Sequence, residues 1–208
     1  GYLPEAIINY MAFLGWNPGD EKEIYSLPSL VKEFSLEKVQ KGGAIFNIKK
    51  LESLNGFYIR QRSLEKITEM CLPYLVNAGL VEENKADAEN IKKIVSLYRE
   101  RLKKISEIIG LADFFFKENL DYDKELLKWK DIKEEEVKDV LNKLEDILSE
   151  INENNWTKEN LENVLLLEAE RMGPAPQQAG YGVKDRGYLL WPLRVALTGQ
   201  EASAGPFE

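Results

Sequence analysis

The sequence predicts an all-α protein. Apolar residues recur at helical spacing along the chain, and no segment alternates apolar and polar residues for long enough to indicate a sheet. Residues suited to starting or ending a helix flank several of these periodic segments. At 208 residues, the chain can hold one large helical domain or two small ones with a proper core. A candidate subdomain boundary lies within residues 80–87, where the polar run VEENKAD separates two groups of predicted helices.

The first helix is expected to begin at Pro4, because proline is favoured in the first helical turn, and to end at Gly15. Glu5 complements the positive end of the dipole of this helix. Asn47 is expected to cap a second helix that runs through Tyr58.

A third helix is expected between Ser63, which can cap its start, and Gly79, which can end it. Pro73 lies inside this segment and predicts a kink or a break. Cys71 falls on the apolar stripe of the same segment. We therefore interpret Cys71 as a core residue and not as a reactive thiol.

Two longer helices are expected at residues 88–109 and 133–152, each with one apolar stripe. Thr157 can cap a further helix that reaches about Arg171. Residues 173–187 are rich in glycine and proline, which predicts a surface loop.

The composition excludes several kinds of site. With no histidine and one cysteine, the chain can form neither a histidine acid–base site nor a Cys/His metal cluster, nor an internal disulfide. The lone cysteine, the lack of a signal peptide and the lack of a long apolar run indicate a soluble, cytoplasmic protein. The net charge of -8 argues against a protein that coats nucleic acid through bulk electrostatics.

The charges are unevenly distributed. Residues 91–106 carry six lysines or arginines against one acidic residue, whereas residues 117–160 carry eight lysines against fourteen acidic residues. A run of like charges is usually only a solvated helix face. The separation nevertheless leaves one basic face available for RNA.

Motifs for nucleotide chemistry are absent. The chain contains neither G-x-x-x-x-G-K-[ST] nor G-x-G-x-x-G, so no glycine-rich phosphate-binding loop is predicted. Carboxylate pairs are common, but they fall on helix faces that point toward water, and nothing distinguishes any one pair. The sequence therefore predicts no catalytic site.

Four motifs do point to a known family. They are GYLPEAIINYMAFLGW at residues 1–16, FNIKKLESLNGFYIR at 46–60, LYRERLKKI at 97–105 and WPLRVALTG at 191–199. Together they resemble the C-terminal, anticodon-binding part of bacterial-type glutamyl-tRNA synthetases, which are class I enzymes. The resemblance covers nearly the whole chain and implies a fragment that begins just past the catalytic domain and its two ATP-site signatures.

The family's architecture gives expectations for the fold. The resemblance implies two helical subdomains of the anticodon-binding helix-cage type. Residues 1–80 would form the stem-contact and first anticodon-binding subdomain, and residues 81–208 the second anticodon-binding subdomain. Relatives continue into at least one further C-terminal helix, so we expect a truncated second subdomain. The loop at 173–187 is longer than the usual connection in the family.

The resemblance also implies which residues contact tRNA. By register with the family, Arg101 would read the third anticodon base and Arg194 the first. An alternative to RNA contact is a structural role, in which Arg194 forms an ion pair with an acidic residue such as Glu168 or Glu170. The residues expected to contact the tRNA backbone, or to support those that do, are Arg99, Lys103, Lys104, Asn55, Tyr58 and Arg60.

Two of these expectations depend on local geometry. If residues 88–109 form one helix, Arg99 and Lys103 lie on one flank of its apolar stripe and Arg101 and Lys104 toward the other. The two arginines then could not aim at one base. For Asn55, which precedes a glycine, a local turn or cap is as plausible as RNA contact.

These expectations combine into one function. The chain would recognise the anticodon of tRNA(Glu) for a glutamate–tRNA ligase, without activating glutamate itself. The fragment would need no cofactor or metal, whereas the full-length enzyme would use ATP and Mg²⁺. Its partners would be tRNA(Glu) and the catalytic domain of the same chain, in a monomer, with no membrane involved. The alternatives are the helical cage of a class I lysyl-tRNA synthetase and a helical protein-interaction module that binds no RNA.

Overall fold

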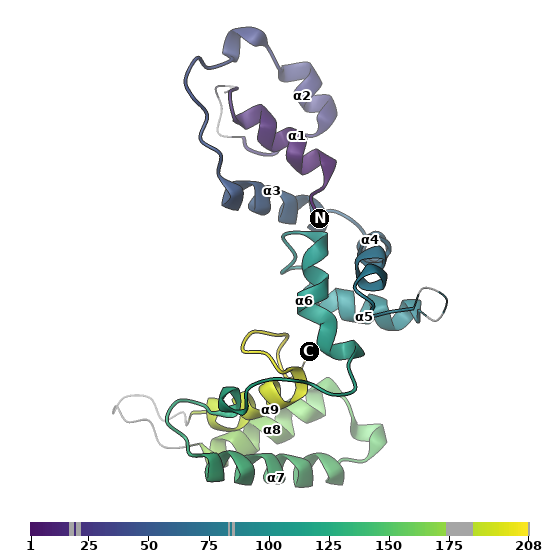
Figure 1. Ribbon diagram of the computed structural model, residues 1–208, viewed down its shortest axis with the longest axis vertical. Helices are drawn as coiled ribbons and strands as arrows, with labels where there is room; N and C mark the ends of the chain where they lie inside the picture. The colour runs from purple at the N-terminus through teal and green to yellow at the C-terminus, as the bar shows by residue number, and fades with distance from the viewer. Residues whose placement is uncertain (17–18, 20–21, 83, 85, 174–184, 208) are drawn as a thin grey trace. The chain divides into compact units, whose positions relative to one another are not determined.

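The computed structural model describes residues 1–16, 19, 22–82, 84, 86–173 and 185–207. Within this part of the chain all regular structure is helical, apart from an isolated antiparallel bridge between Trp16 and Val39, which confirms the predicted all-α class. The chain divides into two compact units, Gly1–Phe116 and Lys117–Glu208 (Figure 1).

The first unit contains six α-helices and three short 3-10 helices among its described residues. In chain order these are α1 (Pro4–Phe13), α2 (Leu27–Glu33), η1 (Leu36–Lys38), α3 (Ile48–Arg60), α4 (Leu64–Asn77), α5 (Ala88–Tyr98), η3 (Ile105–Glu107), α6 (Ile108–Ala112) and η4 (Asp113–Phe116).

The predicted helix starts in this unit are confirmed. Proline occupies the first turn of α1. The side chain of Asn47 accepts a hydrogen bond from Lys50 N at 3.2 Å, and that of Ser63 accepts one from Lys66 N at 3.2 Å. Both bonds satisfy backbone N–H groups that the first helical turn would otherwise leave without a partner. Helix α4 runs through Pro73 to Asn77, so this proline does not break the helix.

The core of the first unit has separate parts. Helix α1 packs on α3 through Tyr10, Leu51 and Leu54, and a second cluster joins Trp16, Tyr25 and Leu30. Helices α4, α5 and α6 pack against one another and bury the apolar stripe predicted for residues 88–109.

The predicted helix at 88–109 is wrong in its extent. Helix α5 ends at Tyr98, residues 99–104 form a turn, and the chain restarts as η3. Tyr98, Leu102 and Ile105 are all buried, at most 2% exposed. A turn followed by a short helix buries these residues as well as one continuous helix would. The apolar period therefore could not distinguish the two conformations.

The structural boundary also differs from the one expected at residues 80/81. That position falls inside the first unit, because α4 on one side of it packs directly on α5 on the other. The division follows Phe116 instead. A polar connecting segment marks a loop, but only packing decides whether the helices beside it share a core.

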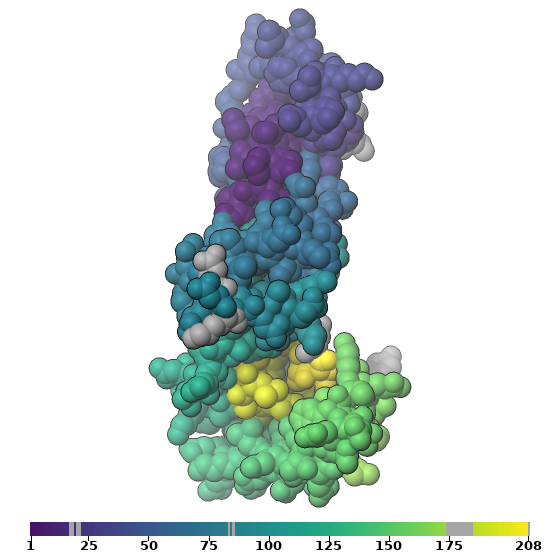
Figure 2. All heavy atoms as spheres, turned by 90° about the vertical axis from the view of Figure 1, so that its right-hand side faces the viewer, coloured from purple at the N-terminus to yellow at the C-terminus, as the bar shows by residue number. Residues whose placement is uncertain are grey.

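Among its described residues, the second unit contains three α-helices and two short 3-10 helices. Its elements are η5 (Lys124–Leu127), α7 (Glu134–Glu150), η6 (Glu153–Asn155), α8 (Lys158–Met172) and α9 (Gly187–Thr198). Helix α9 packs on α7 and α8 around a core that includes Val140, Leu165 and Leu189. In Figure 2 the C-terminal residues, in yellow, lie against the green atoms of this unit.

Two expectations concern the ends of α8. The Thr157 side chain accepts a hydrogen bond from Asn160 N at 3.3 Å, which confirms the predicted cap. Of the predicted loop at 173–187, residues 174–184 lie outside the described part of the chain. None of the described helices is long and apolar enough to cross a bilayer.

The Cys71 thiol is expected to resist alkylation in the folded chain. Cys71 is fully buried in α4, and burial raises the pKa of its thiol to about 12. The reactive thiolate is therefore a negligible fraction at pH 8. A thiol-reactive chromophore should label less than about a tenth of the protein at pH 8 before unfolding and all of it in denaturant. Rapid labelling of the folded chain would contradict the core assignment.

Candidate nucleic-acid interface

The turn at residues 99–104 carries four of the predicted tRNA-contact residues. Its backbone is closed by hydrogen bonds from Arg101 N and Leu102 N to the carbonyl oxygen of Tyr98, at 2.8 and 3.0 Å. The Leu102 side chain is fully buried and anchors the middle of the turn. The turn therefore has one defined conformation from which its charged side chains extend.

Arg99 anchors the start of the turn. Its Nη2 donates hydrogen bonds to the carbonyl oxygens of Arg60 and Arg62, both at 3.0 Å, at the C-terminal end of α3. A guanidinium beside these carbonyls also complements the negative end of the α3 dipole. The expected placement of Arg99 on a flank of a longer helix is wrong, because α5 has already ended. Its role here is to hold the turn against α3.

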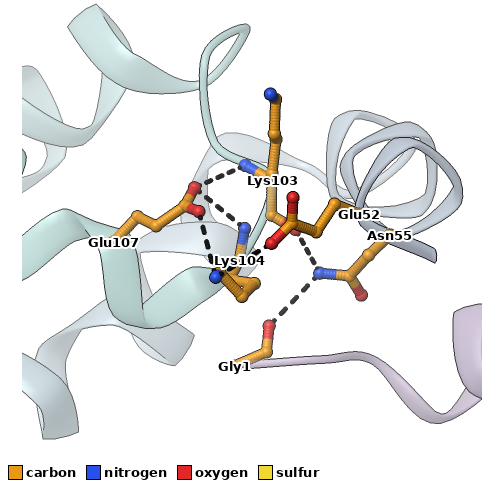
Figure 3. Close-up of polar contacts among 6 residues, drawn as sticks. All are labelled: Gly1, Glu52, Asn55, Lys103, Lys104 and Glu107. Atoms are coloured by element: carbon orange, nitrogen blue, oxygen red, sulfur yellow. Dashed lines mark hydrogen bonds and ion pairs between the residues drawn. The ribbon is translucent and has the colours of Figure 1, made fainter. Parts of the chain in front are cut away.

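Asn55 anchors the end of the turn (Figure 3). The side chain of this residue is fully buried, and its Oδ1 accepts a hydrogen bond from Leu3 N at 2.7 Å. Its Nδ2 donates to the carbonyl oxygens of Gly1, at 3.2 Å, and Lys103, at 2.5 Å. Asn55 therefore joins three segments that are distant in the sequence. It does so through backbone partners and makes no local cap.

Glu107 closes the turn from the other side. Its Oε2 accepts hydrogen bonds from Lys103 N at 2.8 Å and Lys104 N at 3.1 Å, as Figure 3 shows. A glutamate at this position in the first turn of η3 satisfies N–H groups that the helix itself cannot. Gly56 contributes space, since a Cβ there would lie 3.2 Å from the Leu102 carbonyl oxygen.

Lys104 is occupied by acids of the same unit. Its Nζ lies 3.1 Å from Glu52 Oε1 and 3.6 Å from Glu107 Oε1. The hydrogen bond with Glu52 raises the pKa of Lys104. Two carboxylates beside one ammonium leave little net positive charge for a phosphate. Lys104 was predicted either to contact the tRNA backbone or to support residues that do, and its ion pairs favour the supporting role.

The basic segment as a whole offers fewer cations than its composition suggests. Besides Arg99 and Lys104, Lys92 is paired with Glu65 at 2.8 Å. Lys93, Arg101 and Lys103 have exposed side chains. Two of them, Arg101 and Lys103, lie on the turn itself, and Lys93 lies on α5 before it.

Tyr58 and Arg60 take structural positions on α3. The Tyr58 hydroxyl lies 2.8 Å from Asn9 Oδ1 and 2.7 Å from the Tyr25 carbonyl oxygen, and burial raises its pKa. Arg60 Nε is 3.9 Å from Glu100 Oε2. Asn9, which lies within the first motif and to which the sequence assigned no role, is fully buried and accepts a hydrogen bond from Tyr25 N at 2.7 Å.

Arg194 lies on α9 in the second unit. Its guanidinium carbon sits 4.6 Å from the Trp191 ring centroid, and its Nη2 donates to the Glu201 carbonyl oxygen at 2.8 Å. The alternative pairing with Glu168 or Glu170 is not what the structure shows. Among the described residues, Arg171 lies 3.4 Å from Glu168, and Arg186 is paired with Glu170.

Comparison with known proteins identifies the family. The family model described as "Anticodon binding domain" matches residues 66–208, which is more than half of the chain. The chain belongs to the anticodon-binding domain family. This assignment agrees with the all-α fold and with the resemblance carried by the motifs around Arg101 and Arg194. Within the described residues of this anticodon-binding domain, no cluster of acidic or cysteine side chains has the geometry to hold a metal ion.

Two curated relatives of the domain are glutamate–tRNA ligases. The chain is 39% identical to glutamate–tRNA ligase 1 of Caldicellulosiruptor saccharolyticus over 206 residues, which is 96% of this chain and 39% of that protein. It is 36% identical to the glutamate–tRNA ligase of Carboxydothermus hydrogenoformans, over 96% of this chain and 39% of the relative. The domain thus spans about two fifths of the length of these relatives.

Solved structures agree. A crystal structure of a glutamate tRNA ligase from Elizabethkingia meningosepticum superposes with a TM-score of 0.76 at 31% identity, covering 100% of this chain and 38% of that one. The domain is homologous to glutamate–tRNA ligases in both sequence and fold.

Proposed function

We propose that this anticodon-binding domain reads the anticodon of tRNA(Glu) as part of a glutamate–tRNA ligase. Its support is the family match together with the relatives named above, which are glutamate–tRNA ligases. The observation that carries the proposal is an exposed arginine on a braced turn. Arg101 extends from a turn that the buried side chains of Asn55 and Leu102 hold in place.

The bracing matters because recognition of an unstacked base requires donors at fixed positions. The planar fork of arginine can hydrogen-bond a base edge and stack on a neighbouring base, which lysine cannot do. A turn held at both ends by hydrogen bonds loses little further conformational entropy on binding. Lys103 would contact phosphate beside Arg101, and Arg194 on α9 would read the first anticodon base.

The chemistry of the ligase belongs to other parts of the parent chain. In that chain, ATP and Mg²⁺ would act at the catalytic domain, and the anticodon-binding domain would take no cofactor. Correct anticodon contacts would then favour transfer of glutamate to the bound tRNA. The parent enzyme would act in the cytoplasm as a monomer.

Competition binding tests the proposal. Labelled tRNA(Glu) is bound to the domain at low salt and displaced by unlabelled tRNA(Glu), tRNA(Gln) or tRNA(Lys). We expect tRNA(Glu) to compete best. Preference for tRNA(Lys) would favour the lysyl-tRNA synthetase alternative, and no binding at all would favour a protein-interaction module. Glutamate-dependent ATP–pyrophosphate exchange by the domain alone would contradict the assignment of chemistry to the parent chain.

Binding is expected to be weak and strongly salt-dependent. Each phosphate contact contributes a slope of about -0.7 in log K against log salt for single strands. A handful of contacts should therefore give a slope of about -2 to -4.

The two neighbouring lysines should differ in their share of this slope. Lys103→Gln should flatten it by about 0.7, because the exposed ammonium would lie on phosphate. Lys104→Gln should change it little, since Glu52 and Glu107 already neutralise that side chain. If the wild type and Lys103→Gln gave equal slopes, Lys103 would not contact phosphate, and the RNA would bind away from this turn.

A further inference from the structure

A tryptophan outside the family motifs packs against the helix face that carries Arg194. Gly187, Trp191 and Arg194 are separated by four and three positions on α9, so they share one face of this helix. Trp129, which lies between η5 and α7, packs on the same face. We propose that Trp129 is a positioning residue for Arg194 and acts through Trp191. The proposal rests on the function given above.

The three side chains pack in a row, with the two rings tilted against each other, and we refer to this row as the stack. The rings of Trp129 and Trp191 have centroids 5.1 Å apart at an interplanar angle of 38°. The Arg194 guanidinium lies 4.6 Å from the Trp191 centroid, within the range of a cation–π contact. Trp191 therefore lies between Trp129 and Arg194, and its ring orients the Arg194 guanidinium.

Hydrogen bonds fix the orientation of both rings. Trp129 Nε1 donates to Asp185 Oδ2 at 3.0 Å, and Trp191 Nε1 donates to the Leu126 carbonyl oxygen at 2.7 Å. Lys130 Nζ lies 5.1 Å from the Trp129 centroid and is paired with Asp185 as well. The hydrogen bond with Lys130 lowers the pKa of Asp185, which keeps this acceptor ionised at neutral pH.

Gly187 makes the approach of Trp129 possible. A Cβ at Gly187 would lie 2.6 Å from both Nε1 and Cζ2 of Trp129, a distance too short for real atoms. The indole therefore rests directly on the backbone of the first residue of α9. Any side chain there would displace it from the stack.

The guanidinium of Arg194 is half-buried. Its Nη2 donates to the Glu201 carbonyl oxygen, and its Nε is buried with no hydrogen-bond partner among the described residues, so a base edge would be met by the terminal Nη groups. The stack holds this arginine in one orientation, as recognition of a base edge requires.

Replacement of Trp129 should change discrimination at one base only. Competition binding would use tRNA(Glu) transcripts that differ only at the first or only at the third anticodon base. For Trp129→Leu we expect the preference at the first base to fall by about three- to twentyfold, the upper figure being the loss expected if the cation–π contact between Trp191 and Arg194 is lost completely. The preference at the third base, assigned to Arg101, should not change.

Three further variants distinguish positioning from a general loss of structure. Trp129→Phe keeps a ring against Trp191 and should retain most of the first-base preference. Gly187→Ala should reproduce the Trp129→Leu result without changing either tryptophan. Trp156→Leu is the matched control, since Trp156 is a half-exposed tryptophan of the same unit whose Nε1 bonds the Ile151 carbonyl oxygen; it should leave both preferences unchanged.

Near-ultraviolet circular dichroism reports on the stack without tRNA. Coupling between Trp129 and Trp191 should disappear in Trp129→Leu and persist in Trp156→Leu. Equal losses of preference at both bases, or an unchanged first-base preference, would overturn the positioning role. If the wild-type domain shows a third-base preference and none at the first base, the role of the stack is also wrong. A wild-type domain with no preference at either base would contradict the proposed function itself.

Discussion

Replacing Arg101 with glutamine is expected to reduce the preference of the domain for tRNA(Glu) over tRNA(Gln) by about ten- to a hundredfold. The two tRNAs differ at the third anticodon base, which is cytosine in glutamate tRNAs and guanine in glutamine tRNAs. The carbonyl oxygen and ring nitrogen of cytosine are acceptors, and an arginine offers only donors. At the positions where cytosine places these two acceptors, guanine presents an N–H and an amino group, so the same guanidinium would meet donors there. A glutamine amide both donates and accepts, and thus accommodates either base.

In Arg101→Gln, the affinity for tRNA(Glu) should fall by a smaller factor than the preference for tRNA(Glu) over tRNA(Gln). Loss of charge-assisted hydrogen bonds costs about 1 to 3 kcal/mol, and the glutamine amide recovers part of it. Lys93→Gln is the matched control, because Lys93 is an exposed cation on α5, in the same basic segment of the sequence as Arg101. It should lower affinity for both tRNAs equally. Competition binding that shows the preference lost in Lys93→Gln and kept in Arg101→Gln would mean that Arg101 does not read this base.

The structure changes what is expected of Arg99. A glutamine there would remove the donors to the Arg60 and Arg62 carbonyl oxygens, so its main effect should be a less stable turn. Any loss of preference would then accompany a loss of stability of the first unit. In Arg101→Gln, by contrast, the denaturation midpoint should change less than in the Arg99 variant, because the Arg101 side chain is exposed.

Replacing Asn55 with alanine is expected to lower the free energy of unfolding of the first unit by about 2 to 5 kcal/mol. The substitution removes hydrogen bonds to three backbone groups, namely Leu3 N, Gly1 O and Lys103 O. Asn55 is fully buried, so these groups would lose their partner in a site that water enters poorly. Urea denaturation followed by circular dichroism measures the change.

Two comparisons make this result specific. Asn77→Ala, at an exposed position at the end of α4, should change stability by less than about 0.5 kcal/mol. Asn55→Ala should also reduce the tRNA(Glu) preference at temperatures where the unit stays folded, because the Lys103 carbonyl would no longer be held. Wild-type stability in Asn55→Ala would show that the three hydrogen bonds contribute little. If Asn55→Ala is destabilised but keeps the wild-type tRNA preference, the hydrogen bond to the Lys103 carbonyl oxygen is not needed for recognition.

The sequence by itself determined the helices whose signals are local. Asn47, Ser63 and Thr157 each cap a helix through a backbone N–H three residues away, so the pattern and the structure depend on the same few residues. The helical class followed from periodicity, and the family followed from four short motifs. Arg101 and Arg194 were singled out because the motifs carry them in order along the chain.

Tertiary structure alone decided where the long helix ends and what holds the turn after it. The apolar period continues past Tyr98, but Arg99 and Asn55 tie the chain to α3 at partners 37 to 48 residues away. Packing also decided the boundary between the units and the position of Trp129, which lies against Trp191 of α9 and donates a hydrogen bond to Asp185, 56 positions along the chain. Periodicity records which residues are buried. It does not record which distant backbone group a buried polar side chain will bind, because that depends on how the helices pack.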